Sequence, residues 1–332
     1  SRNNQGIVLP FLTGQDAPVS VLATSLYQNI PPADDDEMQF LPGQGRKLLV
    51  FSDSRQDAAF FAPYLERTYQ QILRRRLILQ TLEEDQDAKD GDLRMEDMVS
   101  RVKKQAERCG LFLPTDSRDK RNSTVYKWLM QEFVALDRRI SLEGLGLIQF
   151  SLVKPERWRP PAPLVSDPWN LTSDEAWNLI AILFDTLRTQ ACIRFPENVD
   201  PRDEDFSPRN QMYYISDRIP DSKNHIFSWL PARGNNRRSD FLSKILAQSA
   251  PELDEKLRDQ IAIRDLEEIW KNITRDPVWR YHFSSEPGQG LGYQANHKMW
   301  TIAPIASNQL VYQCSRCKGL TTLNLKGVCS NY

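Results

Sequence analysis

The residues best suited to chemistry are three cysteines near the end of the chain. Cys314 and Cys317 are separated by two residues, Lys318-Gly319 follows, and eleven residues separate Cys317 from Cys329. Two thiolates at this spacing on a tight turn can bind one tetrahedral Zn²⁺ at about 2.3 Å, and Gly319 lets backbone amides face the sulfurs. The pattern predicts a structural zinc site, because nothing nearby supplies the open position and general base of a catalytic zinc.

A structural zinc site needs four ligands, and the sequence offers three. We expect the fourth just past Tyr332, because the chain stops in the middle of the site; His297 and His282 are possible but less natural ligands. Two other interpretations of Cys314 and Cys317 remain open. They could be a redox pair, although no βαβ unit surrounds them, or unrelated buried cysteines.

A second set of polar residues follows an apolar run at residues 47–52, KLLVFS, which is typical of a short buried parallel strand. Ser54 and Asp57 then have the spacing of a helix-capping pair. Such a junction places backbone N–H groups and Arg55 where a phosphate can sit. The simpler interpretation of Ser54 is a plain helix cap, and both roles are compatible.

The run LLVFSDSRQDAAFFAPYLERT closely resembles the fourth conserved motif in the second RecA-like domain of superfamily 2 helicases. The match is to large bacterial DEAD/DEAH-box-type helicases, some associated with antiphage defence, in which a cysteine-rich element follows a helical insertion. The segments DAPVSVLATSLYQNIP and YQCSRCKGLTTLNLKGVC also resemble that group. The resemblance implies that Ser52, Ser54 and Arg55 contact the sugar-phosphate backbone of the tracked strand, without reading its sequence.

The resemblance also implies ATP and Mg²⁺ as cofactors of the full-length protein. In such enzymes the first RecA-like domain carries the phosphate-binding loop and the Asp-Glu box, and later motifs of the second supply arginines that reach ATP. This sequence has no G-x-x-x-x-G-K-[ST] motif and no arginine-rich motif after Cys329. We therefore expect ATP to bind mostly outside this chain, which cannot hydrolyse ATP by itself. We also expect the missing first RecA-like domain to be the partner of this chain.

The loop PARGNNRR is the best of several basic clusters, because a flexible Gly-Asn segment with three arginines can wrap a phosphate chain. We predict that Arg237 and Arg238 bind nucleic acid, for which DNA is the working expectation. The other clusters are better interpreted as solvated faces. Trp158 and Trp169, in proline-rich joints, are expected to clamp these joints in preference to stacking on bases.

The elements that must position these residues indicate an α/β protein with three parts. Residues 1–92 are predicted to start a partial RecA-like helicase C-terminal domain, with helices at residues 16–30 and from residue 54 to about 82. Residues 93–280 read as a mainly helical insertion, in which Thr172 and Glu175 form a capping box. Residues 281–332 read as a truncated, β-rich zinc-ribbon-like module, with strands expected within 300–305, 310–313 and 320–325.

Composition argues against a strongly basic nucleic-acid binder, a membrane-spanning protein and a disulfide-stabilised protein. The 332 residues include 43 Lys and Arg against 44 Asp and Glu, so no global basic field attracts nucleic acid and any polyanion contact must be local. The longest apolar stretch, residues 179–184, is too short to span a membrane. Five cysteines suggest no disulfide framework, so we expect a reducing, cytoplasmic setting with Cys109 and Cys192 packed as small hydrophobes.

Two functions remain open. The first is a fragment of an ATP-dependent nucleic-acid helicase or translocase, to which this chain contributes a strand-backbone grip and accessory surface. The second is a non-catalytic, zinc-containing interaction module that docks a protein or nucleic-acid partner. A phosphate-binding loop upstream in the gene and an arginine-rich motif downstream would favour the first.

Overall fold

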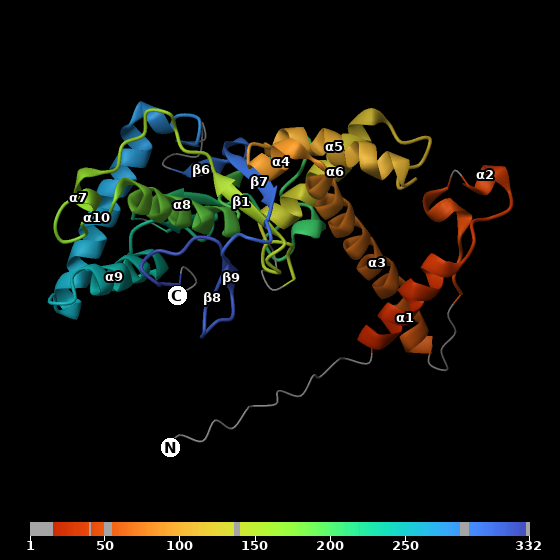
Figure 1. Cartoon of the computed structure of the whole chain (residues 1–332), viewed down its shortest axis with the longest axis horizontal. Helices are drawn as coiled ribbons and strands as arrows, with labels where there is room; N and C mark the ends of the chain where they lie inside the picture. The colour runs from red at the N-terminus through yellow and green to blue at the C-terminus, as the bar shows by residue number, and fades with distance from the viewer. Residues whose placement is uncertain are drawn as a thin grey trace, which may run out of the picture. The chain divides into compact units, whose positions relative to one another are not determined.

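The structure of the chain is a computed structural model (Figure 1). It describes residues 16–39, 41–49, 55–135, 140–218, 220–285 and 292–329; within these, the side chains of residues 16–20, 42 and 55–63 are not described. The chain divides into two compact units. One comprises residues 1–78 and 104–117, and the other residues 79–103 and 118–332.

The described part of the first unit is helical. It contains α1 (Asp16–Asn29), α2 (Asp36–Gln39), the 3-10 helix η1 (Pro42–Gly45) and most of α3 (Arg55–Glu84). The two long helices confirm the predictions from periodicity, and α1 ends before the two prolines at 31–32. Tyr27 packs edge-on against Tyr69, with ring centroids 5.2 Å apart.

The strand predicted at residues 47–52 is not seen in residues 47–49, the part of it that the structure describes. These residues have no strand assignment, and Leu49 is 82% exposed. A strand needs a hydrogen-bonded neighbour, and the described part of this unit contains none. Residues 50–54, with Ser52 and Ser54, lie outside the described residues, so the RecA-like sheet stays a prediction.

The centre of the second unit is α8 (Ser173–Thr189), which Figure 1 shows crossing the middle of that unit. Its residues are buried on almost every side, as expected of a helix that lies inside a protein. The predicted capping box is confirmed at its start. Thr172 Oγ1 accepts a hydrogen bond from the amide of Glu175 at 3.2 Å, and Glu175 Oε2 accepts one from the amide of Thr172 at 2.9 Å.

Two sheets contact α8, one through β1 and one through β6. The first pairs β1 (Ile148–Leu152) with β7 (Trp300–Pro304) in antiparallel register, Phe150 opposite Ile302. The second has the strand order β2-β6-β3-β4, with β5 also paired to β6; the β2–β6 and β3–β4 pairs are parallel. Its members are β2 (Ile193–Arg194), β3 (Tyr214–Ser216), β4 (Ile226–Ser228), β5 (Phe283–Ser285) and β6 (Tyr293–Asn296).

The remaining elements outside the first unit's core helices and the two sheets are mainly helices. They are α4 (Gln86–Asp90), α5 (Met95–Arg108), α6 (Arg118–Phe133), α7 (Ala162–Val165), α9 (Arg237–Ser249), α10 (Glu255–Arg275), η2 (Glu204–Phe206), η3 (Pro277–Trp279) and η4 (His297–Met299). A separate hairpin joins β8 (Tyr312–Gln313) to β9 (Leu320–Thr321).

The domain boundary predicted at residue 281 is wrong. Strands on both sides of it pair with each other, β1 with β7 and both β2 and β3 with β6, so residues 93–280 and 281–304 share one body. The insertion is largely helical as predicted, but its described residues also form four strands. These strands have two to five residues and their partners are distant in sequence, so no local pattern marks them. The fold class is mixed helix and strand, consistent with α/β.

Aromatic rings fill the core around α8. Trp177 and Phe184 stack on Trp279 with interplanar angles of 13° and 15°. Trp158 packs edge-on against Trp177, and Trp169 is almost fully buried. Both rings are enclosed by protein, as expected if they clamp their proline-rich joints, and neither is exposed for base stacking.

A buried cation fixes the last turn of α8. Arg188 has no exposed surface, donates from Nη1 to the carbonyl of Phe133 at 2.5 Å, and forms ion pairs with Asp185 and Glu143. Its guanidinium also lies 4.9 Å from the ring centroid of Phe150. Burial lowers the pKa of Arg188, but the charges of Asp185 and then Glu143 outweigh burial, and the net pKa is raised.

Replacing this cation should be costly. We expect Arg188→Met to lower the free energy of unfolding by about 3 kcal/mol, the low end for a broken buried pair because both carboxylates keep some contact with water. Urea unfolding followed by tryptophan fluorescence measures the change. Arg159→Met, at an exposed arginine, is the control and should shift stability by less than about 0.5 kcal/mol. Equal midpoints for the two variants would contradict the assignment.

Candidate metal centre

The turn between β8 and β9 places Cys314 and Cys317 side by side. The amide of Cys314 donates to the carbonyl of Gly319 at 3.0 Å, and the amide of Lys318 donates back to the carbonyl of Cys314 at 2.9 Å. Lys318 adopts a left-handed conformation with φ of 60°, which is uncommon for a residue with a side chain. These bonds close the turn in the way the Cys-x2-Cys-Lys-Gly pattern predicts.

Backbone amides point at the sulfur atoms. The amide of Cys317 lies 3.5 Å from Cys314 Sγ, and the amide of Gly319 lies 3.4 Å from Cys317 Sγ. Hydrogen bonds from the amides of Cys317 and then Arg316 lower the pKa of Cys314 to about 7. A substantial share of this thiol is therefore thiolate near neutral pH, and the thiolate is the form that binds metal.

A second turn brings Cys329 to the same place. It is closed by a bridge between Leu325 and Val328 and by Asn324 Oδ1, which accepts from the amide of Gly327 at 2.9 Å. Cys317 Sγ and Cys329 Sγ are 3.7 Å apart, and the three sulfur atoms all lie within 4.8 Å of one another. Sulfurs bound to one tetrahedral zinc lie about 3.8 Å apart. The cluster of Cys314, Cys317 and Cys329 can therefore bind a metal ion.

The cysteine cluster is attached to α8 through the second turn. Leu325 is buried, and Lys326 Nζ lies 2.7 Å from Glu175 Oε1 in the first turn of α8. The hydrogen bond from Lys326, with that from the amide of Thr172, lowers the pKa of Glu175. One carboxylate therefore caps α8 and also holds the turn that carries Cys329.

Neither histidine considered as a fourth ligand belongs to the cluster. Among the described residues, the group that can hold a metal consists of the three cysteines alone. His282 Nε2 is hydrogen-bonded to the carbonyl of Val153 at 2.7 Å, and His297 Nδ1 to that of Arg194 at 2.7 Å. Both rings are buried in the fold. A fourth ligand past Tyr332 stays a prediction.

The two isolated cysteines differ. Cys192 is fully buried, as predicted, and burial raises its pKa to about 12. Cys109 is exposed, so the prediction of a packed hydrophobe is wrong there. It directly follows α5, at a helix end where the amphipathic pattern no longer determines which side is buried.

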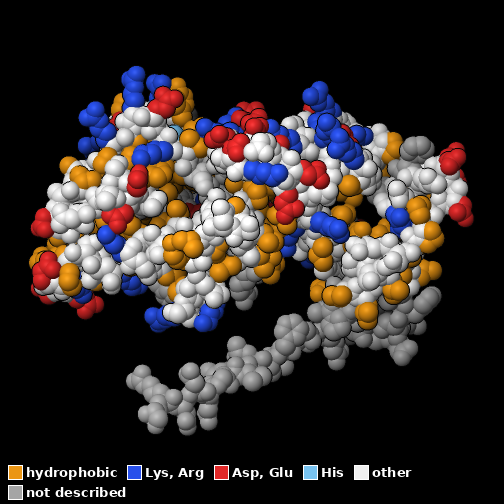
Figure 2. All heavy atoms as spheres, in the orientation of Figure 1, with side chains coloured by type: hydrophobic (Ala, Val, Ile, Leu, Met, Phe, Trp, Pro, Cys, Tyr) orange, Lys and Arg blue, Asp and Glu red, His pale blue; other side chains and the backbone are white. Residues whose placement is uncertain are grey.

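The residues predicted to bind nucleic acid are described only in part. Arg55 is the first residue of α3, but its side chain is not described, and Ser52 and Ser54 lie outside the described residues. Arg237 begins α9 and is exposed. On the face shown in Figure 2, basic and acidic side chains are interspersed, without one extended basic surface.

Arg238 is buried, with 5% of its surface exposed. It donates to Thr186 Oγ1 at 3.1 Å and to Gln190 Oε1 at 2.7 Å, and its guanidinium lies 5.0 Å from the ring centroid of Trp229. Burial lowers its pKa to about 10. A phosphate contact by Arg238 has no support in this placement, because α9 begins one residue earlier and turns this side chain into the core.

Comparisons of the chain with protein-family models, with curated protein sequences and with solved structures give no match. Within the described residues, no helix has both the length and the apolar composition needed to cross a bilayer. The assignment of function therefore rests on the sequence and on the geometry of the sites described above.

Metal analysis tests the cluster directly. We expect close to one zinc per chain after purification at pH 8 and dialysis, measured by inductively coupled plasma mass spectrometry, and a large loss in Cys317→Ser. Zinc affinity should fall as pH is lowered below about 7, because protons then compete with zinc for the Cys314 sulfur. Cys109→Ser removes an exposed thiol outside the cluster and should retain the metal. Equal zinc in both variants would exclude this site.

The buried histidines predict a pH dependence of stability. Burial lowers the pKa values of His282 and His297, so near pH 6 the unfolded chain binds more protons than the folded chain. Stability therefore falls on acidification below about pH 6.5. Urea midpoints measured from about pH 7.5 to 5.5 with a chelator present should change less in the His282→Gln/His297→Gln variant. Parallel pH profiles would show that these rings do not contribute.

Proposed function

We propose that this chain is a segment of an ATP-dependent nucleic-acid helicase or translocase, with an accessory body closed by a structural zinc ion. The observation that carries the proposal is the gathering of Cys314, Cys317 and Cys329 within 4.8 Å. This cysteine element follows a largely helical region, in the order expected from the resemblance of residues 48–68 to a helicase motif. ATP and Mg²⁺ would bind mostly outside this chain.

Zinc is the proposed metal because three thiolates on two tight turns suit a soft, tetrahedral site. Its role is structural. The turn that carries Cys329 is bound to α8 through Lys326 and Glu175, so the metal would hold the β8–β9 hairpin against the rest of the second unit. No step of ATP hydrolysis is assigned to this metal.

In this proposal Ser52, Ser54 and Arg55 grip the backbone of one nucleic-acid strand, with DNA as the expected partner. Arg237, exposed at the start of α9, is an accessory contact. Arg238 is left out because its guanidinium is used inside the protein. Nucleotide binding between two RecA-like lobes would move this grip along the strand.

The full-length protein tests the grip. Arg55→Ala should weaken single-stranded DNA binding by about tenfold, the loss expected for one charge-assisted phosphate contact, and should lower unwinding in parallel. Fluorescence anisotropy with a labelled oligonucleotide measures affinity, and a strand-displacement assay measures unwinding. Arg159→Ala is the matched control. Unchanged affinity and unwinding in Arg55→Ala would remove the grip, and a full-length protein without DNA-stimulated ATP hydrolysis would remove the helicase proposal.

The alternative is a non-catalytic, zinc-containing interaction module that docks a protein or nucleic-acid partner. One observation favours it: the first unit has no strand in its described part, and it exposes apolar side chains. Those on α1 and after η1 are Val21, Leu22, Leu26 and Leu49. Such a surface suits a docking role. Zinc binding without any ATPase activity in the full-length protein would support this alternative.

A further inference from the structure

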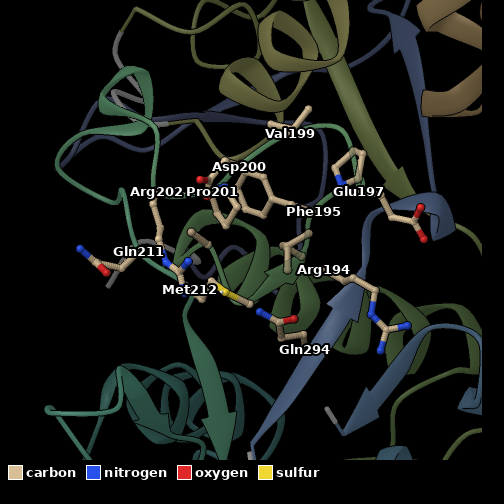
Figure 3. A pocket seen from close by; sticks show the side chains of 13 residues that line it. Arg194, Phe195, Glu197, Val199, Asp200, Pro201, Arg202, Gln211, Met212 and Gln294 are labelled. Atoms are coloured by element: carbon tan, nitrogen blue, oxygen red, sulfur yellow. Dashed lines mark hydrogen bonds between the residues drawn. The ribbon is translucent and has the colours of Figure 1, made fainter. Parts of the chain in front are cut away.

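A pocket of about 520 Å³ opens in the second unit beside β2 and β6. Figure 3 shows side chains from three segments around it: the chain that follows β2, the segment before β3, and β6. Its volume falls in the range of sites that hold small molecules, about 300–1,000 Å³. The lining residues used below are Phe195, Glu197, Asp200, Arg202, Met212 and Gln294.

Gln294 supplies a hydrogen-bond acceptor without a partner. The residue is 95% buried, and its Nε2 donates to the carbonyl of Tyr213 at 2.8 Å, which fixes the orientation of the amide. Within the described chain Oε1 has no hydrogen-bond donor, and Gln294 lines the pocket. A ligand N–H group placed there would satisfy a buried acceptor.

Phe195 and Met212 supply an apolar wall. The Phe195 ring packs edge-on against the buried Phe206, with centroids 5.1 Å apart and an interplanar angle of 88°. This contact holds the Phe195 ring while it lines the pocket. A held aromatic ring and a polarizable thioether suit a flat, heteroaromatic ligand.

The charged side chains of the pocket wall can form further ion pairs and hydrogen bonds. Arg202 has no carboxylate partner in the described part of the chain; its Nη2 contacts Met212 Sδ at 3.7 Å, and Figure 3 shows the two side chains together on one side of the pocket. Asp200 accepts the amide of Arg202 through Oδ1, and Glu197 is exposed. An unpaired guanidinium suits a phosphate, whereas carboxylates accept hydrogen bonds from ribose hydroxyls.

We propose that this pocket binds a nucleotide. A base N–H donates to Gln294 Oε1, the base lies against Phe195, the ribose hydroxyls donate to Asp200 or Glu197, and the phosphate pairs with Arg202. The ligand is either a free mononucleotide or an unpaired nucleotide of a strand, since both carry the same groups. The site goes beyond the proposed helicase function and does not depend on it.

Calorimetric titration of the full chain with AMP, GMP, CMP and UMP tests the proposal. We expect at least one to bind with a Kd below about 1 mM, and Arg202→Gln to weaken that binding about tenfold by removing the phosphate contact. The matching nucleoside lacks the phosphate, so its weaker binding should be the same in wild type and Arg202→Gln. Arg159→Gln, at an exposed arginine outside the pocket, should bind the mononucleotide as wild type does.

A single-stranded oligoadenylate of twelve nucleotides distinguishes a free mononucleotide from a nucleotide of a strand as the ligand. Binding of a mononucleotide that is lost in Arg202→Gln supports a free-nucleotide site, and binding of the oligonucleotide alone, lost in the same variant, supports a strand nucleotide. Gln294→Met should weaken nucleoside binding as well, because it removes the base contact; if it does not fold, Arg202→Gln decides. Absence of binding by both ligands, or equal binding by wild type and Arg202→Gln, overturns the proposal. Failure of the helicase proposal appears separately, as absent ATP hydrolysis.

Discussion

The position of α8 depends on the buried charge of Arg188. This guanidinium, which has no exposed surface, joins the last turn of α8 to the carbonyl at the end of α6 and to Glu143. An ion pair of this kind gains little over an apolar packing of the same volume, but removing one partner leaves a buried charge without compensation. Both proposed sites lie on chain segments attached to α8. Glu175 at its start holds the cysteine turn, and Ala191 and Ile193, just past its end, line the pocket.

Two buried arginines near the end of α8 are stabilised in opposite ways. Arg188 has two carboxylates, so its pKa rises above the ordinary value. Arg238 has the neutral acceptors Thr186 and Gln190, so burial dominates and its pKa falls to about 10. It still carries a charge at neutral pH, which the Trp229 ring and the polar acceptors must stabilise. Arg238 therefore acts as a hydrogen-bonded link between α9 and α8.

Local patterns in the sequence are sufficient to predict several features of the structure. The capping box at Thr172, the long helices and the Cys-x2-Cys turn each depend on residues close together in the chain, so their patterns predict them. The pairing of β1 with β7 depends on residues about 150 positions apart, and no pattern within five residues encodes it. The burial of Arg238 is not predictable from composition for a related reason. Composition marks PARGNNRR as a basic loop, but the Asn236 cap decides which of its arginines faces inward.

The β8–β9 hairpin has less apolar support than the rest of the second unit. Between residues 305 and 329 only Leu325 is buried, which is far too little apolar surface to order about 25 residues against their conformational entropy. Three sulfur atoms within 4.8 Å would repel one another as thiolates if no cation lay between them. Binding of zinc would remove this repulsion and close both turns at once, so its binding free energy would become folding free energy of the hairpin. The link from Lys326 to Glu175 would then transmit that order to the start of α8.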